Sequence, residues 1–92
     1  MPRFLIEVPH DAEKMACLQA IKVFLSTGSH FVANAEWGCK DGDHRAWILL
    51  DADSKQDAEH VLPPAFRHKA TIIGINRFTI PEVEEMLSHH QG

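Results

Sequence analysis

The residues from 30 to 51 constrain the fold more than any other part of the chain. They read HFVANAEWGCKDGDHRAWILLD, in which two apolar-rich runs flank the dipeptide Asp41-Gly42. Because Asp-Gly supplies the positive φ angles that a type I′ turn needs, this pattern predicts a β-hairpin. The sequence therefore contains at least one antiparallel strand pair with a defined register.

The predicted turn fixes which residues face each other across the hairpin. Glu36 lies opposite Trp47, and Cys39 lies opposite His44. Since side chains alternate along a strand, one face of the hairpin suits a core and the other is half polar. The core face carries Phe31, Ala33, Ala35, Trp37, Cys39, His44, Ala46, Ile48 and Leu50, and the second face carries His30, Val32, Asn34, Glu36, Arg45, Trp47, Leu49 and Asp51.

The remaining segments predict two further strands and three helices. Strand patterns occupy 2–9 and 70–78, and helix patterns run from Asp11 as N-cap to Gly28 as C-cap, from Ser54 to the residues before Pro63, and over 80–87 after a Thr79–Glu82 capping box. The first helix carries an apolar stripe of Cys17, Leu18, Ile21, Phe24 and Leu25. Gly74 indicates a bulge or a close approach within its strand.

The order of these elements predicts one α+β domain over residues 1–92. Strand, helix, strand, strand, helix, strand is the ferredoxin-like βαββαβ arrangement, here with an extra C-terminal helix. Its four-stranded antiparallel sheet has the order 4-1-3-2, with the helices on one face. Phe4, Ile6, Val8, Ile73 and Ile75 are expected to join the hairpin's core face.

Composition excludes several classes of function. The net charge of −4 and pI near 5.9 leave no basic stripe for nucleic acid. No apolar run approaches the roughly 20 residues that span a bilayer, and the start MPRFLIEV lacks the features of a signal peptide. Two cysteines make no disulfide framework. We therefore expect a cytoplasmic protein without membrane or nucleic-acid partners.

The sheet face away from the helices is expected to be uncovered within one chain. It carries Leu5, Val32, Trp47 and Leu49 among polar residues. An exposed apolar patch of this kind marks an interface or a ligand site, and a two-fold pair buries one self-complementary surface twice. We expect a homodimer through this open face; the alternative is that the terminal helix at 80–87 folds over it.

A first candidate site lies at one end of the predicted sheet. His10 ends the first strand, Cys39 ends the second, and His44 begins the third, so all three meet at the same end. Thiolate and imidazole ligands suit Ni, Zn or Cu better than Mg or Ca. Asp41, Asp43 and His68 are near enough in the predicted fold to add a ligand.

Two other readings of this end of the sheet stay open. Cys39 is a candidate nucleophile with His44 as its base, and the start of the first helix would lower the pKa of the thiol. The plainer reading is a small apolar residue beside a solvated imidazole. Cys17 is expected to be a buried, inert core residue, and His60 and His68 surface residues.

A second candidate site lies on the open face. Glu7, Glu36 and Arg45 are the candidate catalytic residues, since half-buried carboxylates serve as general acids and bases. Asn34, Trp47 and Asn76 are the candidate ligand-binding residues. The alternative is that Glu36 and Arg45 form salt bridges and Trp47 packs in an interface.

In its element order and short length, the chain resembles the dimeric α+β barrel superfamily. The opening MPRF and the step Gly28-Ser29-His30-Phe31 also look like a small bacterial nickel-binding domain family. The resemblance implies a homodimeric domain that binds a small ligand or a transition metal. The first alternative is a cofactor-free isomerase or monooxygenase of the barrel type that uses the open-face carboxylates, and the second is a non-catalytic protein-interaction module. No metal ligand is carried over from it.

Overall fold

The computed structural model describes residues 1–27 and 29–91, with side chains as far as His89. The elements are β1 (Arg3–Pro9), α1 (Lys14–Ser26), α2 (His30–Ala33), β2 (Glu36–Trp37), the 3-10 turn η1 (Cys39–Asp41), β3 (Arg45–Asp51), α3 (Lys55–His60), α4 (Pro64–Arg67), β4 (Thr71–Ile75) and α5 (Ile80–Gln91). Within these ranges, no helix is both long and apolar enough to cross a membrane.

The sheet has the predicted topology. Its strand order is β2-β3-β1-β4, which is 4-1-3-2 read from the other edge, and every neighbouring pair is antiparallel. β1 lies in the middle: Leu5 pairs with Leu49 on β3 and with Ile73 on β4. The predicted α+β class with a four-stranded antiparallel sheet is confirmed.

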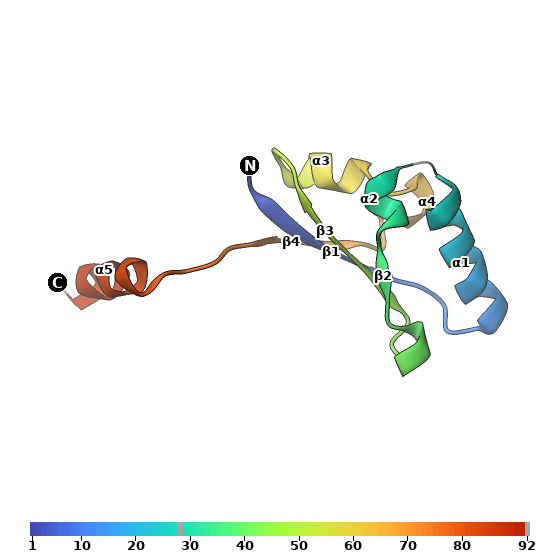
Figure 1. The fold of residues 1–92 in the computed structure, drawn as a ribbon, viewed down its shortest axis with the longest axis horizontal. Helices are drawn as coiled ribbons and strands as arrows, with labels where there is room; N and C mark the ends of the chain where they lie inside the picture. The colour runs from blue at the N-terminus through green and yellow to red at the C-terminus, as the bar shows by residue number, and fades with distance from the viewer. Residues whose placement is uncertain (28, 92) are drawn as a thin grey trace.

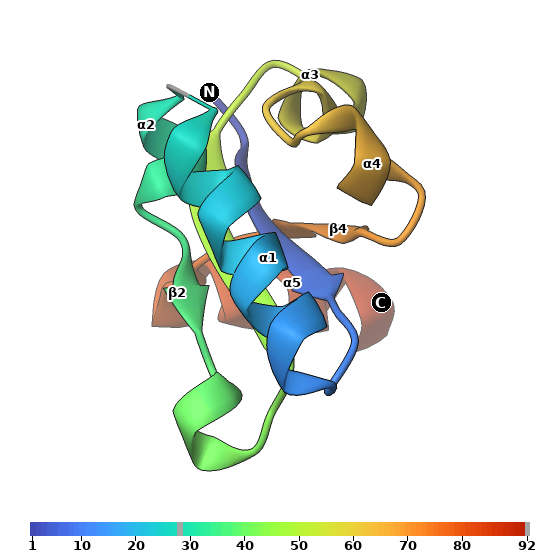
Figure 2. The same ribbon diagram turned by 90° about the vertical axis from the view of Figure 1, so that its right-hand side faces the viewer.

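Helices α1 to α4 gather on one face of the sheet, whereas α5 lies apart from it (Figures 1 and 2). The core forms between that face and the four helices, because alternate strand residues point toward them. Its buried members are Phe4, Ile6, Val8, Phe24, Val32, Ala46, Ile48, Leu50, Ala52, Ala58 and Leu62. Burial of this apolar surface, worth about 25 cal/mol per Å², is the main stabilising term.

The hairpin register is confirmed at Glu36–Trp47 and Trp37–Ala46, but the turn differs from the prediction, and Cys39 lies in it instead of pairing with His44. Glu36 pairs with Trp47 as expected. The connection is a 3-10 turn over Cys39–Asp41, and Gly42 is the one described residue with a positive φ, at 84°. A type I′ turn needs two such residues, so this is not one. The register survives because the longer connection joins the same residue pair.

The first half of the predicted hairpin strand is helical. His30–Ala33 forms α2. The Asn34 side-chain amide donates to the His30 carbonyl at 2.8 Å, and this hydrogen bond stabilises the single helical turn. As a result Val32 is fully buried and Ala33 is exposed, the reverse of the strand prediction. β2 is left with only two residues.

The phase of β4 also differs from the prediction. Ile72 pairs with Ile6 and packs against the core, whereas Ile73 lies opposite Leu5 on the open face. The assignment of Ile73 and Ile75 to the core was therefore wrong. Gly74 lies opposite Phe4 in an unbroken ladder, so it marks no bulge.

Helix α1 buries a narrower face than the sequence suggested. Cys17, Ala20 and Phe24 are buried, whereas Leu18 and Leu25 are exposed. The helix begins later than predicted, since the N-cap is Glu13 and not Asp11. The expected C-cap, residue 28, lies outside the described residues.

Ser54 caps α3 as predicted, and α5 begins at its predicted capping box. The Ser54 hydroxyl accepts from the Asp57 backbone N–H at 3.1 Å. The Thr79 hydroxyl accepts from the Glu82 backbone N–H at 3.3 Å and donates to the Glu82 carboxylate at 3.0 Å. Helix α5 then continues past the predicted end at residue 87, as far as Gln91.

Helix α5 does not fold over the open face. It stands at the end of the extended segment 76–79 (Figure 1). The molecule consequently measures 56 × 28 × 20 Å, and its radius of gyration of 16.7 Å exceeds the value of about 12 Å for a compact chain of this length. The open face and one side of α5 are both left uncovered.

The reversed phase at α2 predicts opposite effects for one substitution at two adjacent positions. Val32→Ser removes a fully buried side chain and should lower the free energy of unfolding by about 2–4 kcal/mol. Ala33→Ser, at an exposed position, should change it by less than about 0.5 kcal/mol. Urea denaturation followed by circular dichroism measures both. If Ala33→Ser lowered the free energy of unfolding more than Val32→Ser, these residues would form a strand and not α2.

Candidate metal centre

The site is built around the end of β1 and the start of β3. The His10 backbone N–H donates to the His44 carbonyl at 3.0 Å, which extends the β1–β3 ladder by one pair beyond Pro9 and Arg45. The two imidazoles therefore lie side by side, with ring centroids 5.5 Å apart and nearly perpendicular planes. The core register thus determines the position of both rings.

The loop from Gly38 to His44 brings Cys39 to the same place. The Gly38 carbonyl accepts from the backbone N–H groups of Asp41 and Asp43, each at 3.0 Å, which closes the loop tightly. A Cβ at position 38 would lie 2.7 Å from the Asp43 carbonyl oxygen, so this approach requires glycine. The closed loop holds Cys39 against the end of the sheet.

Helix α1 supplies a fourth side chain, Cys17. Figure 2 shows the start of α1 and the β2–β3 loop at the same end of the sheet. The Glu13 carboxylate accepts from the Met15 and Ala16 backbone N–H groups and caps the helix there. Cys17, in the first turns of the helix, points its thiol into the cluster.

The four side chains form one compact cluster. His10 Nε2 lies 3.2 Å from both sulfur atoms, and the two Sγ atoms of Cys17 and Cys39 lie 3.3 Å apart. With a nitrogen of His44, all four donor atoms lie within 4.8 Å of one another. Tetrahedral zinc with such ligands places neighbouring donors about 3.3–3.8 Å apart. The cluster can hold a metal ion with only small side-chain movements.

The surroundings favour the neutral forms of two of the donors, His10 and Cys39. Burial lowers the pKa of the His10 imidazole below its ordinary value, and the nearby His44 lowers it further. Burial also raises the pKa of the Cys39 thiol, and its contact with Cys17 adds to that shift. A neutral imidazole offers its lone pair to a metal, whereas each thiol must release its proton when a metal binds.

These shifts oppose the nucleophile interpretation of Cys39. An activated cysteine needs a lowered pKa, and the expected lowering by the start of α1 is the opposite of what the structure gives. The nearest imidazole nitrogen to the Cys39 sulfur belongs to His10, and this contact was not expected. The arrangement therefore favours coordination over nucleophilic attack.

Two ring nitrogens in the cluster lack protein partners. Among the described residues, Nδ1 of His10 and Nδ1 of His44 are buried without a hydrogen bond. Buried polar atoms are normally paired, so a bound ion or another ligand would satisfy an unpaired nitrogen of this kind. Trp37 packs edge-on against His10, with centroids 5.4 Å apart, and screens this side from solvent.

The structure brings together the three predicted metal residues, His10, Cys39 and His44, and adds Cys17. Cys17 is buried as predicted, but its thiol belongs to the cluster. The sequence held one usable signal: the first helix starts where the first strand ends, so a cysteine in its early turns lies near that end. The rotation of the helix decided whether the thiol faced inward.

The other residues considered as ligands lie outside the cluster. Asp43 binds Arg45 through two hydrogen bonds of 2.6 and 2.7 Å, and this guanidinium lowers the pKa of the carboxyl. Asp41 and His68 are exposed, as is His60. The cluster of histidine and cysteine donors contains no carboxylate.

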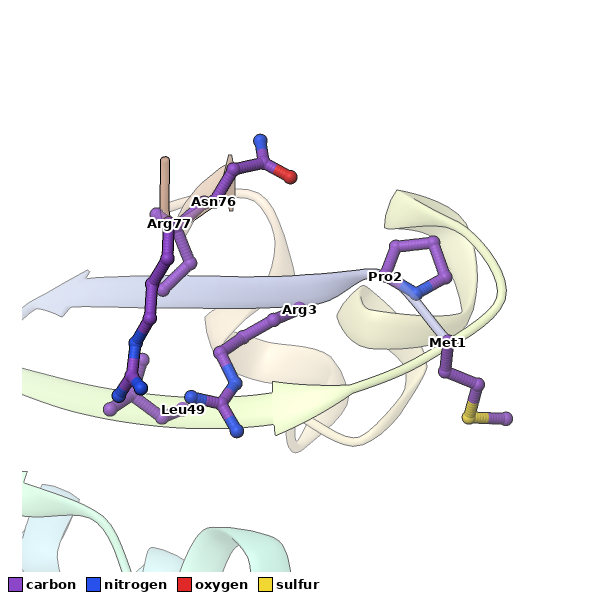
Figure 3. Close-up of a pocket in the computed structure, with 7 residues that line it drawn as sticks. Met1, Pro2, Arg3, Leu49, Asn76 and Arg77 are labelled. Atoms are coloured by element: carbon purple, nitrogen blue, oxygen red, sulfur yellow. The ribbon is translucent and has the colours of Figure 1, made fainter. Parts of the chain in front are cut away.

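The structure places five of the six open-face candidates around Trp47. Glu7 Oε1 accepts from Trp47 Nε1 at 2.9 Å and from the Arg45 guanidinium at 3.4 Å. Together with Trp47, Glu36 and Asn34 line a hollow of about 370 Å³. The remaining candidate, Asn76, lines a different hollow, at the far end of β1 (Figure 3).

No protein-family model matches the sequence, and no curated protein or solved structure is similar enough to count as a match. The resemblance to the dimeric α+β barrel superfamily and to nickel-binding domains thus remains an expectation. The function has to be argued from the geometry of the cluster.

The tight loop predicts a specific effect of Gly38→Ala. The added methyl group meets the Asp43 carbonyl and the Trp47 ring, so the loop must shift at a cost of about 1–3 kcal/mol and displace Cys39 and His44. Side-chain NMR spectra should show changed ring shifts for His44 and His10.

Gly42→Asn is the matched control for this change. A Cβ there meets no atom within 4 Å, and asparagine tolerates the positive φ. Its histidine ring shifts should match those of the unaltered chain. Unchanged ring shifts in Gly38→Ala would contradict the described loop.

Proposed function

We propose that this chain binds one transition-metal ion through His10, Cys17, Cys39 and His44, and that Zn²⁺ is the preferred ion. The observation that supports the proposal is the convergence of four soft donors from separate segments within 4.8 Å. The segments are the end of β1, the first turns of α1, the β2–β3 loop and the start of β3. Both cysteines of the chain belong to this set.

The donor set favours zinc. Two sulfurs and two nitrogens around one point match the tetrahedral geometry typical of Zn²⁺, whereas Ni²⁺ and Cu²⁺ favour square-planar or tetragonal sites. Cu⁺ is the main competitor, since it also prefers thiolates. Among the residues that the structure describes, Nδ1 of His44 is buried without a hydrogen-bond partner, and a bound cation would satisfy an atom of this kind.

The site is closed, which indicates a structural or metal-storing role. Four protein ligands fill a tetrahedral zinc site and leave no position for water or substrate, unlike a catalytic centre with three ligands. A bound ion would cross-link α1, the β2–β3 loop and the end of the sheet. A domain of this size has a small core and is only marginally stable, so such a cross-link would add substantially to its stability.

The open face gives weaker support for the alternative of an isomerase or oxygenase. The Glu7 carboxylate already accepts hydrogen bonds from Trp47 and Arg45. Asn34 uses its amide to hold the end of α2. One carboxylate oxygen of Glu7 and the amide nitrogen of Asn34 are thus already engaged within the chain.

Metal affinity of the purified chain tests the proposal. In a background with His89→Asn and His90→Asn, which removes adjacent imidazoles from the tail, a competition titration should give one Zn²⁺ per chain. Cys17→Ser should weaken zinc binding on the order of 100-fold or more, since the ion's binding energy is shared among four ligands. When Co²⁺ replaces zinc, the thiolate charge-transfer bands of Cys17→Ser should be weaker than those of the parent chain.

His68→Asn is the matched control, because it removes an exposed imidazole outside the cluster. It should leave both stoichiometry and affinity unchanged. Equal affinity for Cys17→Ser and the parent chain, or the absence of one tight zinc per chain, would refute the proposed metal centre.

A further inference from the structure

The uncovered face of the sheet and the uncovered stripe of α5 suggest how two copies of this chain combine. On the sheet, Leu5, Leu49 and Ile73 lie side by side in one row across three strands. Leu49 is 61% exposed and Ile73 is 44% exposed. A contiguous apolar row of this kind is unusual on a surface that faces water only.

Helix α5 carries a second apolar surface. Ile80, Val83, Met86 and Leu87 recur at helical spacing and form one stripe, and each is 40–75% exposed. Phe78 closes this stripe at one end, and together with Val83, Met86 and Leu87 it lines an apolar hollow of about 260 Å³. A 12-residue helix is marginal alone in water, so its stripe needs a partner surface.

The direction of the chain separates these two surfaces. β4 ends at Ile75, and the segment 76–79 continues outward before α5 begins (Figure 1). The chain therefore carries α5 away from its own sheet. Each copy presents both a helix that needs cover and a sheet face that needs cover.

We propose that two copies form a two-fold dimer in which α5 of each chain packs on the open sheet face of the other. This exchange covers both surfaces at once, and the two-fold axis repeats the helix-on-sheet contact twice. Eight apolar side chains per chain take part: Leu5, Leu49, Ile73, Phe78, Ile80, Val83, Met86 and Leu87.

The buried area suits a stable dimer. If all eight side chains became fully buried, they would lose on the order of 80–100 Å² each on average, and the pair would bury about 1,400 Å² in total. Stable interfaces bury about 1,200–2,000 Å². One helix-on-sheet contact alone would fall below this range, whereas the exchanged pair reaches it.

Charge complementarity points to the same pairing. Figure 3 shows the guanidinium groups of Arg3 and Arg77 together beside Leu49, where they border a hollow of about 560 Å³. On α5, Glu82 and Glu84 flank the apolar stripe on its two sides. A helix laid across Leu49 brings these carboxylates near the two arginines. Because Arg3 also pairs with Asp51 at 3.5 Å, the attraction depends mainly on Arg77, and it supports docking of the second copy's helix there.

The dimer does not depend on the metal centre. β4 is antiparallel to β1, and Ile75 at its end pairs with Arg3 at the start of β1. Helix α5 thus leaves from the end of the sheet opposite His10. Failure of metal binding and failure of dimerisation are separable outcomes.

The test is the mass of the full chain in solution, combined with contacts between chains. Light scattering at micromolar concentration should give twice the chain mass of 10.4 kDa. In a dimer of isotope-labelled and unlabelled chains, isotope-filtered NOEs should join the methyl groups of Val83 and Leu87 to those of Leu5 and Leu49. The isotope filter selects only contacts between the labelled and the unlabelled chain.

Two variants should dissociate the dimer without unfolding it. Val83→Glu on the helix and Leu49→Glu on the sheet place charge in the interface at exposed positions, and each should raise the dissociation constant at least about 100-fold. Ser88→Glu, on the opposite side of α5, should leave it unchanged. Circular dichroism verifies that each variant is folded.

Three results would overturn the exchange. A monomer mass would do so, whether α5 is free or folded on its own sheet. A dimer whose filtered NOEs join sheet to sheet without α5 would do so as well. Equal dissociation constants for Val83→Glu and Ser88→Glu would also contradict it.

Discussion

The pairing of β1 with β3 is the constraint on which the rest of the structure depends. The ladder runs in register from Arg3 opposite Asp51 to Pro9 opposite Arg45, and one more hydrogen bond, from His10 N–H to the His44 carbonyl, completes it. A slip of one residue would move alternate side chains to the other face of the sheet. The same register therefore builds the core and places two imidazoles side by side.

The cluster of His10, Cys17, Cys39 and His44 is an extension of the core. His10 packs against Trp37, and Trp37 packs in turn against the fully buried Phe24 of α1, with ring centroids 4.9 Å apart. These apolar surroundings keep the imidazole of His10 and the thiol of Cys39 neutral. A cation would reverse this balance, because it favours deprotonated thiols and uses the lone pairs of the neutral imidazoles. The packing that orders the core therefore also sets the surroundings of these donor side chains.

Part of this arrangement could be predicted from the sequence. Asp41-Gly42 located the hairpin and its register, and alternation placed His10, Cys39 and His44 at one end of the sheet. The alternating pattern gave a wrong prediction where the chain is helical. The apolar run at α2 resembles a strand, so Ala33 was expected in the core and Val32 on the open face, whereas Val32 is buried and Ala33 is exposed.

Other features depend on tertiary packing that local patterns do not encode. The rotation of α1 decides that Cys17 faces the cluster while the neighbouring Leu18 faces solvent, although both fit a helical stripe. The phase of β4 is set by its pairing with β1, which puts Ile73 on the open face. The direction of segment 76–79, which separates α5 from its own sheet, has no signature in composition or spacing.

X-ray absorption spectroscopy of the chain loaded with one equivalent of Zn²⁺ tests the central claim most directly. We predict a first shell of two sulfur atoms at about 2.3 Å and two nitrogen atoms at about 2.0–2.1 Å. A shell made only of nitrogen and oxygen would contradict it, because the zinc would then be bound without Cys17 and Cys39.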